Sequence, residues 1–441
     1  MRKKLFILFI LAVYIQTGCA QDTIPKKYTV HEVIAKSEYM ADLEQLVKAV
    51  KRNHPQPYTF ITPEEFDLFV RRKKESISDA TTMSEFVWLC KSVVALVGCG
   101  HTSTSVDNVL ELSPSLFFPL EVMYVEDQLY ITDPLNNADV LDQGMEVISI
   151  NGIDVKTLKR ELNAVINSDG YISSLRELQT NMNFRSHCAF QLGFPETYTI
   201  EIRTNTGLKS IELKPSDQSP LKGNDLNPCP DNLCFQMDAD HSLGKITIKS
   251  FNYYNDNLPL FQSFIDSCFK ELELSQPDNL VIDLRNNYGG DPYCTSYLLQ
   301  YLMEQPFRYF RKGSTKWYKD LEQLLPVKQN RFKGNLYLLI NGGCFSSTGH
   351  FLSLVKAHLN AVFVGQETGA TFSCNANPTS FLLNNTGIQV SVATEIYQTD
   401  VSGFSKNEGI FPDYFITPKL NDILTNKDLE MEKVVQLIYE N

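Results

Sequence analysis

The sequence predicts an α/β protein of several domains, and three observations lead to that prediction. At 441 residues the chain is long enough for about three domains of ordinary size. Residues 31–96 have helical periodicity, short strands follow, and strands alternate with helices from His241 onward. Such alternation is typical of a parallel or mixed sheet covered by helices. A hydrophobic content of 43% and a charged content of 21% are those of a folded globular protein.

Residues 1–20 are predicted to be an export signal. A basic start (Met-Arg-Lys-Lys) precedes an apolar run over residues 5–15, and small residues follow. The apolar run is too short for a stable membrane span. Cleavage after Ala20 would release a soluble protein, whereas Thr-Gly-Cys ending at Cys19 resembles a bacterial lipobox, in which Cys19 is lipidated and tethers the protein to a membrane. We therefore expect an exported bacterial protein, in the periplasm or anchored to the outer membrane.

Charge and cysteine content exclude several classes of function. The net charge is −12, and removal of the signal with its three positive charges leaves −15. An acidic surface of this kind argues against nucleic-acid binding, which requires neutralised phosphates. The sequence has no Cys-x-x-Cys pair and no His-Glu-x-x-His helix, so we expect neither a metal site nor a cofactor. Export permits disulfides, of which Cys229–Cys234 is the first expectation and Cys90–Cys99 the second.

Residues 21–105 are predicted to form a helical domain of three helices. Apolar residues recur at helical intervals over residues 39–50, Thr62-Pro63 is a helix start, and a third helix runs from Thr82 to about residue 96. It ends at the glycine-rich sequence Gly-Cys-Gly-His-Thr, which contains His101.

Residues 106–215 are predicted to be short strands around one helix, over residues 155–165. The expected strands cover residues 120–124, 129–131, 145–150, 198–202 and 210–213. A linker over residues 216–240, rich in Ser, Pro, Asn and Asp, is expected to follow.

Residues 241–420 are predicted to be the α/β core, and 421–441 a docking helix. The expected strands of the α/β core are residues 245–251, 280–284, 336–340 and 361–365. The expected helices of the core are residues 258–272, 294–303 and 346–359.

Two strand-to-helix junctions of this core carry candidate chemistry. A glycine turn, Asn-Asn-Tyr-Gly-Gly, ends at Gly290 and can present backbone N–H groups to a ligand, although a simple tight turn is the plainer interpretation. Asp283 and Arg285 flank this turn and are expected to brace it. At the second junction, Ser346 could be a nucleophile or merely a helix N-cap. The spacing Gly-x-x-Ser-x-x-Gly around Ser346 is not the Gly-x-Ser-x-Gly elbow of α/β-hydrolases.

A nucleophilic serine needs a base, and the candidates are few. His350 lies four residues after Ser346, while His101 lies in the glycine-rich turn of the helical domain. Lys356 is ten residues after the serine and is expected to be solvated. Cys344 could be a thiol nucleophile, but its apolar neighbours favour a buried structural residue.

In this combination the chain resembles the S41 serine peptidases, which include the tail-specific processing proteases and the tricorn core domains. The resemblance covers nearly the whole mature chain. Seven short motifs carry it, in order: Gly-Cys-Gly-His-Thr at 98–102, Gly-Met-Glu-Val-Ile-Ser-Ile-Asn-Gly at 144–152, the strand at 244–251, Asp-Leu-Arg-Asn-Asn-Tyr-Gly-Gly at 283–290, Cys-Phe-Ser-Ser at 344–347, Val-Gly-Gln-Glu-Thr-Gly at 364–369 and Gly-Ile-Phe-Pro-Asp at 409–413.

The resemblance implies a ClpP/crotonase-like ββα catalytic core, a PDZ-like domain and an N-terminal helical domain. It also implies that Ser346 is the nucleophile and that Ser347 forms the oxyanion hole through its N–H group, together with Gly289 or Gly290. The tail-specific branch has a lysine base about 25 residues after the serine, and no lysine occurs there in this chain. The tricorn-like branch uses a histidine from the N-terminal region, which corresponds to His101, with an acidic orienting residue.

For that orienting residue the resemblance points to Glu408. Family members commonly have Asp at the position of Cys99 and Glu at that of Gly349, so this chain departs from the pattern at both. With His101 as base, activity should rise with pH through a pKa of about 6 to 7.

The expected function is that of a serine endopeptidase acting on peptides or unfolded proteins, with an oligomeric state that the sequence does not define. The alternative is a binding protein on a peptidase scaffold, without hydrolysis. A separation of more than about 6 Å between Ser346 Oγ and the His101 ring would favour that alternative.

Overall fold

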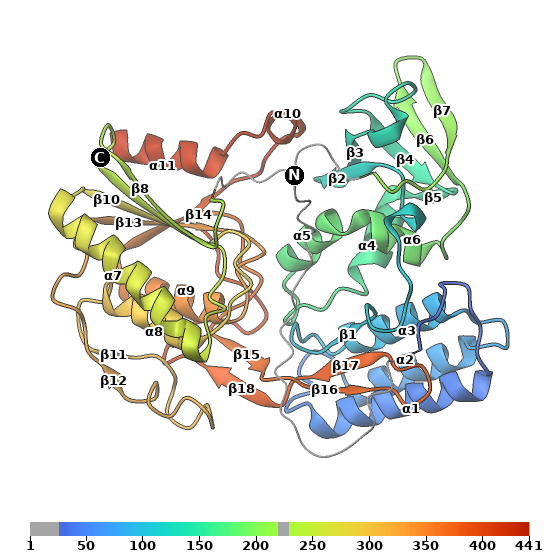
Figure 1. The fold of residues 1–441 in the computed structure, drawn as a ribbon, viewed down its shortest axis with the longest axis horizontal. Helices are drawn as coiled ribbons and strands as arrows, with labels where there is room; N and C mark the ends of the chain where they lie inside the picture. Colours follow the sequence, from blue (N-terminus) through green and yellow to red (C-terminus); the bar gives the residue numbers. More distant parts are fainter. Residues whose placement is uncertain (1–25, 219–228, 441) are drawn as a thin grey trace.

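The structure is a computed structural model that describes residues 26–218 and 229–440. Its principal sheet has six strands in the order β19-β14-β13-β10-β9-β8 (Figure 1). Neighbouring strands are parallel except for the antiparallel pair β8–β9. The strands are β8 (Leu233–Asp238), β9 (Leu243–Ile248), β10 (Asn279–Asp283), β13 (Asn335–Ile340), β14 (Ala361–Gly365) and β19 (Tyr414–Phe415). The predicted α/β core is therefore present as a mixed sheet.

Helices cover both faces of this sheet because its central strands are apolar on both sides. Side chains alternate between the faces of a strand. Ile282 and Leu338 pack with the helices α7 (Leu258–Ser275), α8 (Pro292–Gln300) and α9 (Ser347–His358). Val281 and Leu339 pack instead with α11 (Leu429–Glu440), on the opposite face (Figure 1). The predicted docking helix is thus part of the core.

A second, antiparallel sheet lies in residues 121–213, with the strand order β2-β3-β4-β6-β7 and β5 paired to β4. Its strands are β2 (Glu121–Val125), β3 (Gln128–Asp133), β4 (Glu146–Ile150), β5 (Ile153–Asp154), β6 (Tyr198–Thr204) and β7 (Gly207–Leu213). The predicted helix is α4 (Val155–Asn163), but α5 (Ser174–Met182) and α6 (Phe184–Gln191) were not predicted. The expectation of one helix was wrong: α5 and α6 are short helices of nine and eight residues, and α5 buries only Leu175 and Thr180.

The three N-terminal helices form as the sequence predicts. They are α1 (Lys36–Asn53), α2 (Pro63–Ser76) and α3 (Met83–Ala95). Thr62 and Thr82 cap α2 and α3, and each pairs with a glutamate three residues later in a capping box, which satisfies backbone N–H groups that the first turn leaves free.

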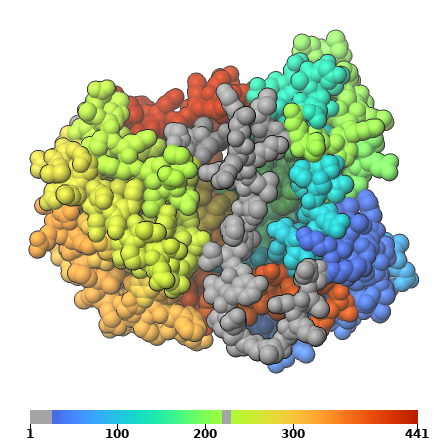
Figure 2. Space-filling model, in the orientation of Figure 1, coloured from blue at the N-terminus to red at the C-terminus, as the bar shows by residue number. Residues whose placement is uncertain are grey.

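A hairpin from the C-terminal half completes the core of this helical region. Strand β1 (Ser103–Ser105) pairs with β17 (Gln389–Val392), which in turn pairs with β16 (Thr379–Leu382). Ile388 and Val390 pack into the same apolar cluster as α1 and α3. In the space-filling view, the N-terminal half (blue to green) lies on the right and the surface of the α/β core (yellow and orange) lies on the left (Figure 2). The smaller elements are β11 (Phe307–Arg308), β12 (Leu324–Leu325), β15 (Ser373–Ala376), β18 (Glu395–Gln398), α10 (Leu420–Leu424) and the 3-10 turns Pro114–Leu116, Leu135–Asn137 and Asn255–Asn257.

Two further expectations are corrected by the structure. The Cys229–Cys234 disulfide is present, but Cys90 and Cys99 are both free and buried, so the second predicted disulfide is wrong. Strand β8 lies within the predicted linker and extends the principal sheet as a partly exposed edge strand. The Ser, Pro, Asn and Asp residues that suggested a linker precede this strand.

The predicted signal, with Cys19, lies outside the described residues. Within residues 26–218 and 229–440, none of the helices is both long enough and apolar enough for a membrane span.

Candidate active site

Ser346 lies between β13 and α9 in an unusual backbone conformation. Its φ is 56° and its ψ is −125°. For a residue with a side chain this region is sparsely populated and costs about 1–3 kcal/mol. The Ser346 side chain forms no capping hydrogen bond, so the plainer interpretation of this serine as an N-cap does not apply. Backbone strain of this kind is typical of residues held for chemistry.

The glycine turn that follows β10 packs closely against the start of α9. A Cβ atom at Gly289 would lie 2.8 Å from Ser346 Cβ and 3.0 Å from Ser347 N. A Cβ atom at Gly290 would lie 2.2 Å from the carbonyl carbon of Phe251. Both glycines also have positive φ, at 94° and 147°. Only glycine lets the backbone come this close to the serine.

The two glycines differ in what their N–H groups do. Gly289 N–H donates to Asn287 Oδ1 at 2.9 Å, which occupies it. Among the described residues, the N–H groups of Gly290 and Ser347 have no hydrogen-bond partner. These two donors belong to the turn and to the helix start that meet beside Ser346.

Asn287 joins the parts of this junction. Its Oδ1 accepts from Thr348 Oγ1 at 2.9 Å as well as from Gly289, and its Nδ2 donates to the Ile248 carbonyl at 2.9 Å. The side chain is fully buried, so these bonds are shielded from water. One amide therefore links β9, the glycine turn and the first turn of α9.

His101 meets Ser346 from the N-terminal region. The distance from its Nε2 to Ser346 Oγ is 3.0 Å, and its ring packs on Phe345 with centroids 4.7 Å apart. A Cβ atom at Gly100 would lie 2.4 Å from Phe345 Cζ, so a glycine before the histidine makes this packing possible.

The electrostatic surroundings of His101 favour the neutral ring. Burial lowers its pKa to about 4, and the Asn375 backbone, which acts in the opposite direction, only partly offsets the burial. The second ring nitrogen, Nδ1, is buried and makes no well-formed hydrogen bond. At neutral pH the ring therefore has a free lone pair available for a proton.

The other candidates are engaged elsewhere. His350 is buried, its Nε2 lies 3.5 Å from Cys374 Sγ, and burial lowers its pKa to about 3. Burial raises the pKa of the Cys344 thiol to about 12, which keeps it protonated. Lys356 is ion-paired with Asp413 at 2.5 Å, and its side chain is 30% exposed.

Glu408 is not brought into the site. Its side chain is exposed and forms no hydrogen bond or ion pair with His101 in the part of the chain that the structure describes. The neighbouring Gly409 N–H is bound by a different carboxylate, Glu367, at 2.8 Å. The structure thus gives no support to Glu408 as the residue that orients the imidazole. No cluster of three or more metal-binding side chains occurs within residues 26–218 and 229–440.

A paired serine and histidine beside two free N–H groups is an arrangement suited to acyl transfer. Residues 242–416 match the family model of peptidase family S41. Residues 242–416 are therefore identified as an S41 peptidase domain. The S41 peptidases are serine-type peptidases, which are hydrolases. No curated protein matches the sequence.

Solved structures show the same fold as this peptidase. A structure of a CPAF mutant has a TM-score of 0.64 at 15% identity, covering 92% of this chain and 97% of that one. Mature CPAF complexed with lactacystin has a TM-score of 0.62 at 16% identity, with coverage of 92% and 99%. A putative peptidase from Parabacteroides merdae has a TM-score of 0.50 at 14% identity, with coverage of 91% and 96%.

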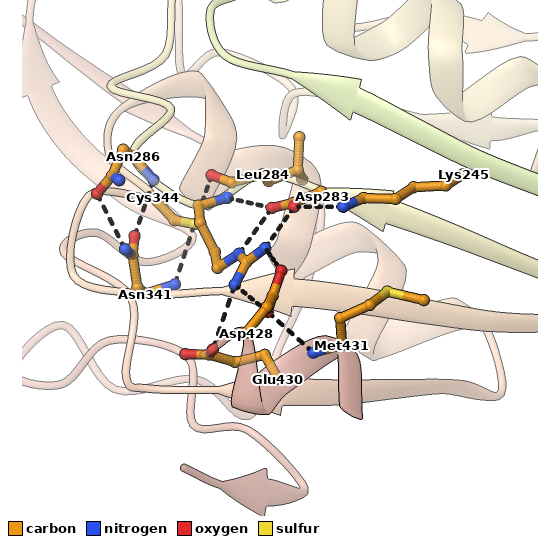
Figure 3. Close-up of polar contacts among 10 residues, drawn as sticks. Lys245, Asp283, Leu284, Asn286, Asn341, Cys344, Asp428, Glu430 and Met431 are labelled. Atoms are coloured by element: carbon orange, nitrogen blue, oxygen red, sulfur yellow. Dashed lines mark hydrogen bonds and ion pairs between the residues drawn. The ribbon is translucent and has the colours of Figure 1, made fainter. Parts of the chain in front are cut away.

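Behind the glycine turn of the peptidase lies a buried ion network (Figure 3). Arg285 binds Asp283 through two bonds of 3.0 and 2.7 Å and Asp428 through two of 2.8 and 2.9 Å, and it contacts Glu430 at 3.2 Å. Lys245 lies 3.3 Å from Asp283. Burial alone would raise the pKa of Asp283, but the arginine and the lysine hold it below its usual value. The expected bracing role is therefore present, and it extends to α11.

A second set of bonds ties the same turn to the strand before Ser346. Asn341 Oδ1 accepts from Asn286 N, and Asn341 Nδ2 donates to Asn286 Oδ1, both at 2.9 Å (Figure 3). Cys344 Sγ donates to the Leu284 carbonyl at 3.1 Å. These side chains explain why the two junctions of the peptidase are held in register.

Two residues of the site were not singled out from the sequence. Asn287 stands inside the quoted Asp-Leu-Arg motif, and a polar side chain between a buried strand and two glycines was a usable signal. Asp169 is different: its Oδ1 accepts from Gly100 N at 2.8 Å, although it lies 69 residues away in the chain. No local pattern distinguishes it from other loop aspartates.

Proposed function

We propose that this chain is an exported endopeptidase that cleaves peptide bonds through an acyl-enzyme on Ser346, with His101 as general base. The observation that carries the proposal is the 3.0 Å separation between His101 Nε2 and Ser346 Oγ. It lies well within the reach of a proton transfer. It also lies far below the separation of about 6 Å that would favour a binding protein without hydrolysis.

In this mechanism His101 removes the proton of Ser346 as its oxygen attacks the substrate carbonyl. The negative charge that develops on the carbonyl oxygen is stabilised by the N–H groups of Ser347 and Gly290. Gly290 is preferred over Gly289 because the Gly289 N–H is already bound to Asn287. The protonated His101 then donates to the leaving amine, and a water molecule activated by the same ring releases the acyl group.

A histidine base fits the surroundings better than a lysine base. Lys356 follows Ser346 on the same helix, but it is ion-paired with Asp413. A general base must lie within hydrogen-bond reach of the serine hydroxyl, and the Nζ of Lys356 is engaged by Asp413 instead. His101 is already neutral at pH 7 because burial lowers its pKa to about 4. Loss of activity by protonation of the base is therefore expected near pH 4 rather than at 6 to 7.

The substrate is proposed to be a peptide or an unfolded protein, held in extended form. Residues 106–215 would act as a PDZ-like domain that binds it by strand addition to a sheet edge. Support comes from the antiparallel sheet in this segment, whose edge strands are β2 and β7. The proposal that the protein is exported rests on the composition of residues 1–20. A lipidated Cys19 would provide a membrane tether.

The test is labelling with a serine-directed fluorophosphonate, followed by peptide mapping. Wild type should be labelled on Ser346, and Ser346→Ala should lose both labelling and peptide cleavage, by at least about 10³-fold. His101→Gln should lose a similar factor. His358→Gln, an exposed histidine on the same helix as the nucleophile, serves as the control and should keep wild-type activity. Cleavage that survives Ser346→Ala would place the nucleophile elsewhere.

A further inference from the structure

A buried carboxyl contacts the loop that carries His101. Asp169 is only 6% exposed, and its Oδ1 accepts the Gly100 N–H at 2.8 Å. Beside it, Gly170 N–H donates to the Gly98 carbonyl at 2.9 Å. The other carboxyl oxygen, Oδ2, is buried without a hydrogen-bond partner. A buried acceptor that is half unused is costly, so packing alone does not explain why a carboxyl stands here.

We propose that Asp169 is the positioning residue of the catalytic base: its carboxylate holds the Gly100 N–H, and its charge state sets how well His101 is aligned with Ser346. The inference rests on the proposed function, since it assigns a role within that reaction. Gly100 directly precedes His101, so a shift of its amide moves the imidazole. A displacement of about 1 Å at a reacting group can cost about 10²-fold in rate.

The segment that carries Asp169 is rigid enough to transmit this constraint. Ser168 Oγ donates to the Ile172 carbonyl at 2.9 Å, which closes the turn on itself. Arg176, from α5, donates to the carbonyls of Ile172 at 3.2 Å and Gly170 at 2.8 Å. The carboxyl is therefore fixed by its own turn, and the loop of the base is held against it.

The groups that face Asp169 leave it able to change charge near neutral pH. Burial raises its pKa to about 7, and the Gly100 N–H and the charge of Arg176 offset this only in part. The facing thiols, Cys99 and Cys374, stay protonated because burial raises the pKa of both. A hydrogen bond to an ionised acceptor is roughly twice as strong as one to a neutral acceptor. Ionisation of Asp169 therefore tightens the loop of the base.

The experiment measures the rate of fluorophosphonate labelling of Ser346 between pH 5.5 and 9, in the full-length mature chain. Wild type should show a rise with a midpoint near pH 7, since the pKa of Asp169 is about 7. Asp169→Asn should abolish that rise and lower the rate at pH 8 by about tenfold, because the neutral amide holds the loop less tightly. With a cleavable peptide, kcat should fall while KM stays within about twofold.

A matched control is Asp42→Asn. Asp42 is also a fully buried carboxyl that accepts backbone N–H groups, including that of Thr386 at 2.7 Å, but it lies in α1. This variant should lose stability and keep the wild-type midpoint. A midpoint near 7 that survives in Asp169→Asn would overturn the inference while leaving the proposed function intact.

A second measurement requires neither catalytic activity nor a substituted protein. In wild type labelled with ¹⁵N-glycine, the Gly100 amide resonance should titrate with a midpoint near pH 7, in keeping with the pKa of about 7 for Asp169. A Gly100 resonance that does not move over this range would overturn the inference. Absence of labelling of Ser346 in wild type at every pH would overturn the proposed function instead.

Discussion

Replacing His350 with leucine should make the chain less sensitive to acid. His350 is 1% exposed, and burial, with a smaller contribution from the charge of His101, lowers its pKa to about 3 from an ordinary value of 6.5. The folded chain therefore holds this ring neutral over a range in which the unfolded chain protonates it. The stability that depends on the neutral ring is complete above pH 6.5 and is lost progressively as the pH falls below that value.

The size of the effect follows from proton linkage. One proton taken up on unfolding changes the free energy of unfolding by about 1.4 kcal/mol per pH unit. Between pH 6.5 and pH 5, wild type should therefore lose about 2 kcal/mol more than His350→Leu. At pH 7.5 the two proteins should differ little in their free energy of unfolding. Leucine loses the ring contact with Phe310, whose centroid is 5.6 Å away, but it also removes a buried Nδ1 that has no partner.

The assay is urea unfolding followed by circular dichroism at pH 7.5 and pH 5.0, with the free energies extrapolated to water. His358→Leu is the control, because this histidine of the same helix is exposed and its variant should run parallel to wild type. His350→Leu should also keep its rate of fluorophosphonate labelling, since the ring faces Cys374 and not Ser346. If the stability gap between His350→Leu and wild type is the same at both pH values, the linkage argument is refuted.

Three further outcomes are expected. Arg285→Ala should lower the free energy of unfolding by about 3–5 kcal/mol in urea unfolding, because it removes the cation that Asp283, Asp428 and Glu430 share, and a loss below about 1 kcal/mol would contradict the role of the network. Gly100→Ala should lower the labelling rate without unfolding the chain, since its Cβ would lie 2.4 Å from Phe345 Cζ, whereas an unchanged rate would show that the ring can move aside. Mass spectrometry of the mature N-terminus should find a diacylated Cys19 or a free start at Gln21, and an intact Met at position 1 in the cell envelope would refute export by cleavage.

The principal sheet could be predicted because its strands are short apolar runs. Strands β10 and β13 are buried on both faces. A strand buried on both faces has a continuous run of apolar residues between turn residues, and this run can be recognised in the sequence. The position of Ser346 could be predicted because glycines flank it at a strand-to-helix junction. Its backbone strain could not, since φ and ψ depend on how Gly289 packs against it.

What the sequence did not reveal depends on contacts between distant segments. The pKa of His101 was expected to be ordinary, but its ring is desolvated by packing that no local pattern encodes. Glu408 was chosen from its place next to a short motif, and a loop of this length does not determine where such a side chain points. Asp169 reaches Gly100 only through the packing of two turns far apart in the chain.

The pairing of β1 with β17 has a consequence for the order in which the site can form. Ser103 is aligned with Ser391, so the strand that follows His101 is held by one that is made almost 300 residues later. The side chains of His101 and Ser346 are themselves 245 positions apart in the sequence. Contacts of such high sequence separation form late in folding because a long loop must close first. A growing polypeptide therefore cannot bring Ser346 and His101 together in this arrangement until nearly all of it has been synthesised.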